Sequence, residues 1–313
     1  EQMPMGAFTL DPPQHQPFRA FLNAGLTPKI VGAKTPSVRG LAGELVRALA
    51  PRRGCEFISA FADVLPLTVF LDLVELPVED RVVLGPLADT ATRDPDPAHR
   101  VAAIGGIAAY LEPHLRQRRA RGGEDLLSRA VNADIAGRPI TEAEALGACI
   151  HIIGAGLDTV SSLFSFVMLH LAQHPDARRA LVENPDLIPV ASLELVRRFP
   201  VVVMVRQVRE DLVYRGVSLR KGEMVALPTP FFNLDETIYE RPLEVDWNRR
   251  VDKVLTFGNG VHRCPGAVLG RNELALGLQA WLQHIPDFGL EAGAPVPVAG
   301  GTVAKILKLP LAW

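Results

Sequence analysis

Hydrophobic residues recur every three or four positions along most of this chain, which is the spacing of amphipathic α-helices. The earliest of these stretches follows Asp11-Pro12-Pro13, a turn that commonly precedes a helix. The same spacing predicts five helices in the first part of the chain, over residues 14–24, 37–49, 55–73, 80–92 and 99–121.

The longest apolar stretch begins at Thr141, where Thr141 and Glu144 have the spacing of a capping box. Apolar residues then lie on all sides of the predicted helix as far as about His174. A helix that is hydrophobic all round is a buried one, so we expect this to be the central helix of the fold. Shorter helices are predicted over residues 175–183, 188–199 and 266–283.

Two segments depart from the helical pattern. Between Val201 and Leu227, runs of β-branched residues are separated by Arg-Gly and Lys-Gly turns, which indicates short strands. Residues 303–309 have an extended pattern. The predicted fold class is therefore mainly α with a small β component, and residues 1–313 are expected to form a single domain.

Composition narrows the class of protein. Hydrophobic residues make up 48% and charged residues 22% of the chain, an ordinary balance for a globular protein, and the net charge of -2 argues against a nucleic-acid partner. No uninterrupted apolar run reaches the roughly 18 residues of a membrane-spanning helix, and no signal peptide is recognised. Cys55, Cys149 and Cys264 form no Cys-x-x-Cys pair, so we expect a cytoplasmic protein without a disulfide framework.

Cys264 lies in a glycine-rich segment just before the predicted helix 266–283, within Phe257-Gly258-Asn259-Gly260-Val261-His262-Arg263-Cys264-Pro265-Gly266. A cysteine thiolate can bind haem iron if the sulfur is shielded from water and receives backbone N–H groups. Glycines permit the tight backbone that this needs, and the N-terminus of the following helix would stabilise negative charge on the sulfur. The alternative is a free buried cysteine in a turn, and the fixed spacing of the Phe, Gly, His and Cys residues argues against it.

This segment resembles the haem-binding signature of the cytochrome P450 family, Phe-Gly-x-Gly-x-His-x-Cys-x-Gly, at every defined position. The resemblance implies the P450 fold, a helical domain with a long central helix and small β-sheets. It implies haem b as cofactor, with Cys264 as the axial ligand of the iron and Gly258 and Gly266 shaping the loop around it. Phe257 would cover the sulfur side of the haem, and His262 would contact a haem propionate.

A second motif lies inside the predicted central helix, at Ala155-Gly156-Leu157-Asp158-Thr159. Glycine weakens a helix, so either another group approaches Gly156 closely or the helix opens locally. Thr159 could simply donate a hydrogen bond to the carbonyl four residues earlier. In the family that the chain resembles, an acid–alcohol pair lies beside the oxygen site. This implies that Asp158 relays protons to Thr159, with Ala155 over the haem on the same helix face.

Glu194 and Arg197 are three positions apart on the predicted helix 188–199, so they share a face of that helix. Such pairs usually lie on solvated surfaces and contribute little to stability. In the P450 family, a Glu-x-x-Arg helix before the strands forms a buried ion pair that braces the surroundings of the cysteine loop. The resemblance therefore implies a structural role for Glu194 and Arg197, in which the planar arginine fork makes bidentate bonds.

The resemblance covers essentially the whole chain and extends to the bacterial camphor-hydroxylase branch of the family. Residues 11–20, 156–160, 194–199, 285–288 and 309–313 carry this further likeness. It also implies that the chain lacks the family's N-terminal strands, first helices and substrate-closing loop. Carried over by position, the likeness implies propionate contacts for Arg19, Arg206 and His262, with His15 as a weaker fourth.

The same comparison implies that Gly154, Val202, Met204 and Val303 line the substrate cavity. Met204 stands where the camphor enzyme has an acidic residue and Gly154 where it has a larger apolar one, so we expect a differently shaped cavity. A lone histidine such as His151 is more often a core residue, yet we expect it to face the substrate from the stripe that holds Ala155. The expected substrate is therefore a small terpenoid or norisoprenoid rather than camphor.

The resemblance implies a monooxygenase that inserts one atom of O₂ into a C–H bond, with two electrons from a [2Fe–2S] ferredoxin docked on the cysteine side near Arg19. No Gly-x-Gly-x-x-Gly nucleotide loop is evident in the chain itself. One alternative is a non-catalytic haem sensor or electron carrier, against which the Asp158-Thr159 pair argues. Others are a peroxide-driven haem-thiolate enzyme, which usually lacks this pair, and an inactive fragment.

Overall fold

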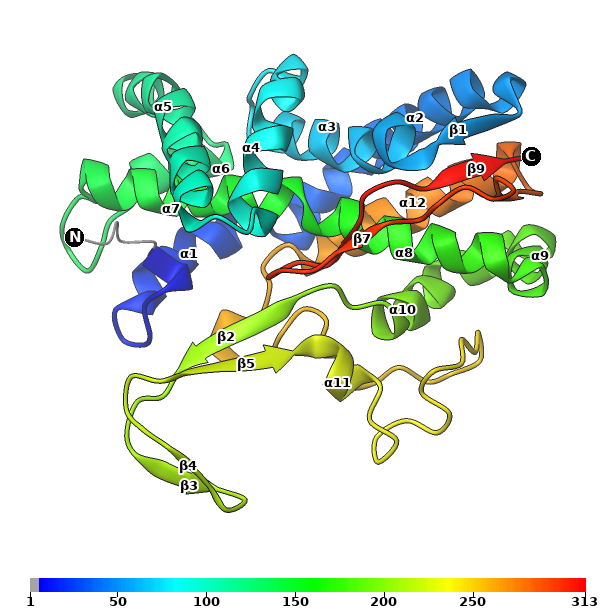
Figure 1. Cartoon of the computed structure of the whole chain (residues 1–313). Helices are drawn as coiled ribbons and strands as arrows, with labels where there is room; N and C mark the ends of the chain where they lie inside the picture. Colours follow the sequence, from blue (N-terminus) through cyan, green and yellow to red (C-terminus); the bar gives the residue numbers. More distant parts are fainter. Residues whose placement is uncertain (1–5) are drawn as a thin grey trace.

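The computed structural model describes residues 6–313, and helices form most of the molecule (Figure 1). In chain order the α-helices are α1 His15–Gly25, α2 Pro28–Leu49, α3 Val64–Leu73, α4 Arg81–Arg93, α5 Pro97–Arg121, α6 Leu126–Val131, α7 Glu142–Leu157, α8 Thr159–Gln173, α9 Pro175–Glu183, α10 Ile188–Arg198, α11 Thr229–Asn233 and α12 Ala267–His284. The strands are β1 Gly54–Glu56, β2 Val203–Gln207, β3 Leu212–Tyr214, β4 Val217–Leu219, β5 Met224–Pro228, β6 Gly289–Leu290, β7 Val298–Ala299, β8 Lys305–Ile306 and β9 Pro310–Ala312. The predicted fold class, mainly α with small sheets, is confirmed.

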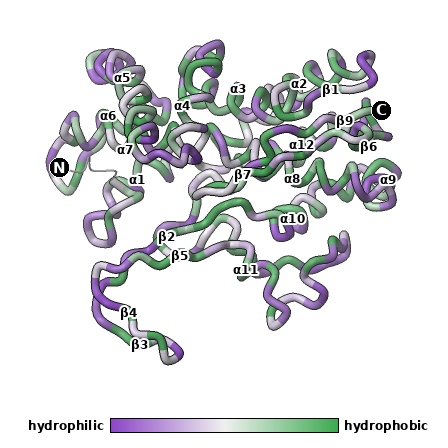
Figure 2. Tube along the Cα trace, in the orientation of Figure 1, coloured by the Kyte–Doolittle hydropathy of each residue, from purple (hydrophilic) through white to green (hydrophobic). Residues whose placement is uncertain are grey.

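The strands pair in small antiparallel sheets. One sheet has the order β1-β9-β6, and β2-β5, β3-β4 and β7-β8 form two-stranded pairs. An isolated bridge between Val202 and Val303 joins the start of β2 to the segment before β8. The hairpin β3–β4 extends away from the helices (Figure 1), and it carries both hydrophobic and hydrophilic positions (Figure 2).

Two hydrophobic clusters form the core. The first lies between α2, α8, α10 and α12. There the rings of Phe57 and Phe61 stand edge-on to Trp281, and Phe57 stacks on Phe164. The second joins α1, α3, α4, α5, α6 and α7. Because α7 belongs to one cluster and α8 to the other, the junction between these two helices lies where the two halves of the core meet.

The predicted central helix is present but is not continuous. Its start is confirmed, since Thr141 and Glu144 make both hydrogen bonds of a capping box. The single helix predicted as far as His174 is wrong, because α7 ends at Leu157 and α8 begins at Thr159. Asp158 interrupts the helix with φ of -128°, and its carboxylate pairs with cations from other elements, which favours a local break over a regular turn.

The predicted helix 55–73 is also wrong in its first half. Cys55 pairs with Leu311 in the β1–β9 sheet, a π-helix follows at Ile58–Ala62, and only Val64–Leu73 is α-helical. The Glu56 carboxylate accepts the backbone N–H groups of Ile58 and Leu309, which ties the segment to the C-terminal strand. A contact between distant parts of the chain therefore overrides the local helical pattern.

The helix predicted from Ser37 begins earlier, at Pro28, where the Thr27 side chain accepts the N–H group of Ile30. Pro36 lies inside this helix rather than before its start. The span Glu142–Gln173 is long and apolar enough to cross a membrane, contrary to the expectation that no such run is present. However, 61% of its most apolar window is buried inside the protein, as expected of a core helix.

Candidate functional site

The cysteine loop places Cys264 immediately before α12. The N–H group of Cys264 donates to the Phe257 carbonyl at 2.8 Å, and the N–H group of Gly266 donates to the Cys264 sulfur. Gly258 has φ of +68°, which favours glycine, and a Cβ atom added there would lie 3.2 Å from the Met204 sulfur, so the Met204 side chain would have to shift. The loop thus supplies one of the N–H groups that a thiolate needs.

The loop differs in one respect from the shielded thiolate site expected from the sequence. Cys264 is exposed, so the loop alone does not shield the sulfur. Desolvation by nearby protein atoms nevertheless raises the pKa of its thiol, while the Gly266 N–H group and the charges of Arg19 and Arg263 oppose that rise. The Phe257 ring packs against the first core cluster.

A cluster of basic side chains lies beside the loop. His262 Nε2 is 3.0 Å from an Asp11 carboxylate oxygen, and the His262 ring stands edge-on to His15 at 4.8 Å. Arg19 donates to the Arg263 carbonyl and, at 2.9 Å, to Asn23. The structure therefore brings together three of the four residues predicted to contact a propionate.

Two details of this cluster point to an anionic group. His15 is 98% buried, yet its Nε2 atom has no hydrogen-bond partner among the described residues. Burial, with the positive charges of His262 and Arg19, lowers the pKa of His15. Arg206 is the outer member: it is exposed, donates to the Val205 carbonyl at 2.8 Å, and helps to lower the pKa of Asp11.

The ion pair predicted between Glu194 and Arg197 is present and buried. Arg197 Nε and Nη2 donate to the two carboxylate oxygens at 2.6 Å and 2.8 Å, and the Arg197 side chain is fully buried. Arg249 also donates to Glu194, at 3.0 Å, an interaction that no local pattern indicated. Because the guanidinium and carboxylate meet in bidentate geometry, this pair is unlike a solvated surface pair.

A chain of hydrogen bonds connects this ion pair to the cysteine loop. Arg197 donates to the Asn233 carbonyl at 2.9 Å, and the Asn233 side chain donates to Thr256 at 2.7 Å and accepts the N–H group of Leu255 at 2.8 Å. Thr256 directly precedes Phe257, whose carbonyl accepts the Cys264 N–H group. Asn233 was not identified from the sequence, since it belongs to no motif and no residue spacing marks it.

One face of α7 is open. Ala155 is exposed, Thr159 and His151 are half-buried, and a Cβ atom added at Gly154 would have nothing within 4 Å. Positions 151 and 155 are four apart and so share a face of α7, and Thr159 is the first residue of α8. Thr159 Oγ donates to the Ala155 carbonyl at 3.2 Å, which is the back-bonding that the sequence left open as an alternative.

Both explanations for a glycine at position 156, a close approach by another group and a local opening of the helix, are confirmed. A Cβ atom at Gly156 would lie 2.3 Å from the ring of Phe70, so α3 approaches α7 at this point more closely than any side chain would permit. The helix also opens two residues later, at Asp158.

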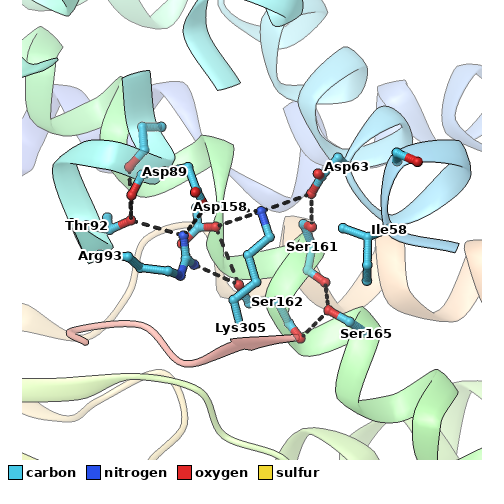
Figure 3. A network of polar contacts seen from close by, with 12 residues as sticks. Ile58, Asp63, Asp89, Thr92, Arg93, Asp158, Ser161, Ser162, Ser165 and Lys305 are labelled. Carbon is cyan, nitrogen blue, oxygen red and sulfur yellow. Dashed lines mark hydrogen bonds and ion pairs between the residues drawn. The ribbon is translucent and has the colours of Figure 1, made fainter. Parts of the chain in front are cut away.

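Asp158 lies in a network of charged side chains on the other side of this junction (Figure 3). It pairs with Arg93 at the end of α4, and Lys305 Nζ from β8 lies 3.6 Å from its other carboxylate oxygen. Lys305 is also 3.3 Å from Asp63 and 3.4 Å from Asp89. Burial raises the pKa of Asp158 by more than the nearby charges of Arg93 and Lys305 lower it.

This network differs from a relay in which Asp158 is hydrogen-bonded directly to Thr159. Within the described chain, no side-chain hydrogen bond joins Asp158 to Thr159, since the carboxylate faces Arg93 and Lys305. Neither cation was identified from the sequence: Arg93 ends an ordinary amphipathic helix and Lys305 lies in a short extended segment. Arg93 is 65 positions from Asp158 in the chain, so no local spacing could have indicated the pairing.

The remaining predicted substrate residues fall in two places. Val202 and Val303 are partners in the isolated β-bridge and lie side by side. Met204 lies with its sulfur against Gly258 of the cysteine loop. A mainly helical fold with small sheets and a cysteine loop of this sequence is typical of the haem-thiolate class of proteins.

Comparison with known proteins agrees with this class. Residues 193–290 match the family model for Cytochrome P450. The chain is 32% identical over 315 residues to the Probable cytochrome P450 127A1 of Sinorhizobium fredii, covering 100% of this chain and 76% of the relative. It is 33% identical over 297 residues to the Steroid C26-monooxygenase of Mycolicibacterium smegmatis, covering 92% of this chain and 74% of that protein.

Solved structures agree as well. The crystal structure of CYP101J2 is 39% identical with a TM-score of 0.88, over 97% of this chain and 76% of that one. For the cytochrome P450 CYP101C1 the identity is 39% and the TM-score 0.89, over 98% and 78% of the two chains. The chain belongs to the cytochrome P450 family, whose members are haem-containing monooxygenases.

The residues present fit haem b. The Cys264 sulfur accepts an N–H group, as a thiolate ligand requires. The buried, unpartnered Nε2 atom of His15, beside Arg19 and His262, offers a donor suited to a propionate. Ala155 is exposed and a Cβ atom added at Gly154 meets nothing within 4 Å, so neither position obstructs a flat group on this face of α7.

Proposed function

We propose that the Cys264 sulfur would bind the iron of haem b and that the chain, acting as one domain, hydroxylates a small terpenoid or norisoprenoid substrate. The observation that carries this proposal is the cysteine loop, in which the sulfur accepts the Gly266 N–H group beside the paired rings of His15 and His262. His15, Arg19 and His262 would hold the propionates, with Arg206 at the outer edge.

Bound haem would supply the activation of O₂, so that one oxygen atom enters a C–H bond and the other leaves as water. The protein's part is to hold and move protons. Asp158 would carry the proton, and burial raises the pKa of its carboxyl above the ordinary value. Thr159 Oγ, fixed by its bond to the Ala155 carbonyl, would receive that proton once the Asp158 carboxyl turns from Arg93 and Lys305.

The absorption spectrum of the reduced protein with carbon monoxide tests the ligand. We expect a band near about 450 nm, the signature of thiolate ligation. Cys264→Ser should lose that band, whereas Cys55→Ser, which changes the cysteine of β1, should keep it. A wild-type spectrum without the band would contradict the proposal.

The electron donor proposed is a small [2Fe–2S] ferredoxin that docks beside Cys264 in the cytoplasm. Two positive side chains, Arg19 and Arg263, act on the cysteine, and an acidic partner would be steered toward them. Arg263→Glu should slow electron transfer from the ferredoxin at low salt and much less at high salt. Arg220→Glu, on the projecting hairpin, is the control. It should leave the rate of electron transfer unchanged at both low and high salt.

A peroxide-driven reaction is a second candidate, because Asp158 is turned away from Thr159 in this structure. Hydrogen peroxide would then supply both the oxygen atom and the two electrons, leaving water as the other product. Product formation with peroxide alone, at a rate equal to that with ferredoxin and a reductant, would favour this candidate. A dependence on the ferredoxin would exclude it.

A further inference from the structure

Phe8 and His151 form an aromatic pair that neither the cysteine loop nor the proton relay explains. Their rings are stacked with centroids 3.7 Å apart and an angle of 27° between the planes. Phe8 ends a short 3-10 helix at Gly6–Phe8, and His151 lies in α7. Although it is stacked, Phe8 is 59% exposed, so its ring covers His151 from outside rather than filling the core.

The ring nitrogens of His151 have no protein partner among the described residues. Burial lowers the pKa of His151 to about 4, and no hydrogen bond or charged neighbour contributes to that shift. The imidazole is therefore neutral near pH 7, with one N–H donor and one acceptor nitrogen. His151 is half-buried, so its unpartnered ring nitrogens are open to a hydrogen bond with a bound molecule.

The open stripe of α7 connects the Phe8–His151 pair to the predicted oxygen site. From His151 it continues past Gly154, where an added Cβ atom meets nothing within 4 Å, to Ala155 and Thr159. At a rise of about 1.5 Å per residue, His151 is roughly 6 Å from Ala155 along α7. Thr159 follows beyond the break at Asp158 and is bonded to the Ala155 carbonyl. A molecule lying on this stripe would reach from the histidine to the oxygen site.

We propose that the Phe8–His151 pair determines substrate specificity by binding the polar end of the substrate. Resting on the proposed function, this inference names the substrate class: a compact hydrophobic molecule with one carbonyl or hydroxyl oxygen. His151 hydrogen-bonds that oxygen, and Phe8 holds the imidazole ring in position by stacking. The carbon to be oxidised lies at the other end, over Ala155 and Thr159.

Two probes that differ only at the oxygen test this inference. One is a thirteen-carbon cyclohexenyl ketone, and the other is the hydrocarbon in which a CH₂ group replaces the C=O. Binding of each to the haem-loaded protein is measured by calorimetry. The wild type should bind the ketone roughly tenfold more tightly, the factor that one neutral hydrogen bond supplies.

His151→Phe keeps an aromatic ring against Phe8 but removes both nitrogens, so the ketone preference should vanish while hydrocarbon binding changes less than about twofold. Phe8→Leu keeps the nitrogens but removes the stack, and the preference should fall below that of the wild type. His170→Phe is the matched control: His170 is also a histidine whose pKa burial lowers to about 4, but it stacks on His174 at the far end of α8. This control should keep the full preference.

A ketone preference that survives in His151→Phe, or a wild type that shows no preference or binds neither probe, would overturn the inference. The carbon monoxide spectrum of the same samples separates this failure from failure of the proposed function. If the thiolate band is present in wild type and His151→Phe, only the role of the pair is wrong. If wild type lacks the band, the proposed function itself is wrong.

Discussion

Asp158 has two environments in this protein, one given by its neighbours in the sequence and one by the fold. In the sequence it precedes Thr159 and has the pattern of an acid–alcohol pair. In the fold its carboxylate pairs with Arg93 and Lys305, and two further carboxylates, Asp63 and Asp89, lie around the same ammonium group. The lysine therefore compensates several negative charges at once.

Replacing Lys305 should show how far the stability of the protein depends on its positive charge. Lys305→Met should lower the free energy of unfolding by about 3 kcal/mol, because it leaves buried Asp158 with less compensation. Lys305→Arg keeps the charge and should retain most of the stability. Urea unfolding at pH 7 measures both variants, and a Lys305→Met protein as stable as wild type would show that the network contributes nothing.

Glu273 is a second acidic residue whose burial disfavours the charged form of its side chain. It is buried in α12, and its Oε2 atom has no hydrogen-bond partner among the described residues. Burial raises its pKa well above the ordinary value of 4.5. The folded protein therefore holds a proton that the unfolded chain releases above that pH.

The sign of the pH effect follows from this difference. Above pH 4.5 and up to the folded pKa, Glu273 should reduce the free energy of unfolding by about 1.4 kcal/mol per pH unit. Glu273→Gln should remove that contribution and be more stable than wild type at pH 7. Urea unfolding from pH 5 to pH 8 checks this, and parallel curves for the two proteins would contradict it.

At the scale of elements, the junction between α7 and α8 brings the site together. The open stripe of α7 ends there, Asp158 turns to the charged network, and Gly156 admits the ring of Phe70 from α3. Helix propensity alone would favour alanine over glycine by about 1 kcal/mol. A Cβ atom 2.3 Å from the Phe70 ring outweighs that preference.

Gly156→Ala should therefore destabilise the protein by about 1–3 kcal/mol, the usual cost of overpacking. Gly154→Ala, two residues earlier in the same helix, meets no atom within 4 Å and should be neutral or stabilising. Thermal unfolding compares the two. Adding Phe70→Leu to Gly156→Ala should recover part of the loss, and failure to recover any would remove Phe70 as the cause.

At the scale of the whole molecule, the cysteine loop is held from a distance. The buried pair Glu194–Arg197 connects through Asn233 and Thr256 to Phe257, which accepts the Cys264 N–H group. Three parts of the chain, α10, α11 and the segment before α12, are therefore fixed relative to one another. The position of the sulfur depends on all three.

Asn233→Ala breaks the middle of this connection. It should lower the free energy of unfolding by about 1–3 kcal/mol, because the Leu255 N–H group loses its buried acceptor. Haem should also be lost to an acceptor protein faster than from wild type, since the loop is less firmly held. Asn248→Ala changes an exposed asparagine and serves as the control. Equal rates of haem loss in all three proteins would show that the connection does not support the loop.

Much of the fold followed from local patterns. The capping box at Thr141 and the helices 175–183 and 188–199 form nearly as predicted, because side-chain periodicity and helix ends are properties of neighbouring residues. The failures at 55–73 and at Asp158 have one cause. In each place, a contact with a distant segment satisfies backbone or charged groups better than a regular helix would.

The sequence by itself determined the residue types and spacing of the cysteine loop, the Glu194–Arg197 pair and the stripe through Ala155 and Thr159, since each is a feature of a few consecutive turns. The tertiary structure alone decided which groups meet them. Lys305 beside Asp158 and Phe8 over His151 are contacts between distant parts of the chain. Long-range contacts and burial set the charge and partners of a side chain, and no local pattern encodes either.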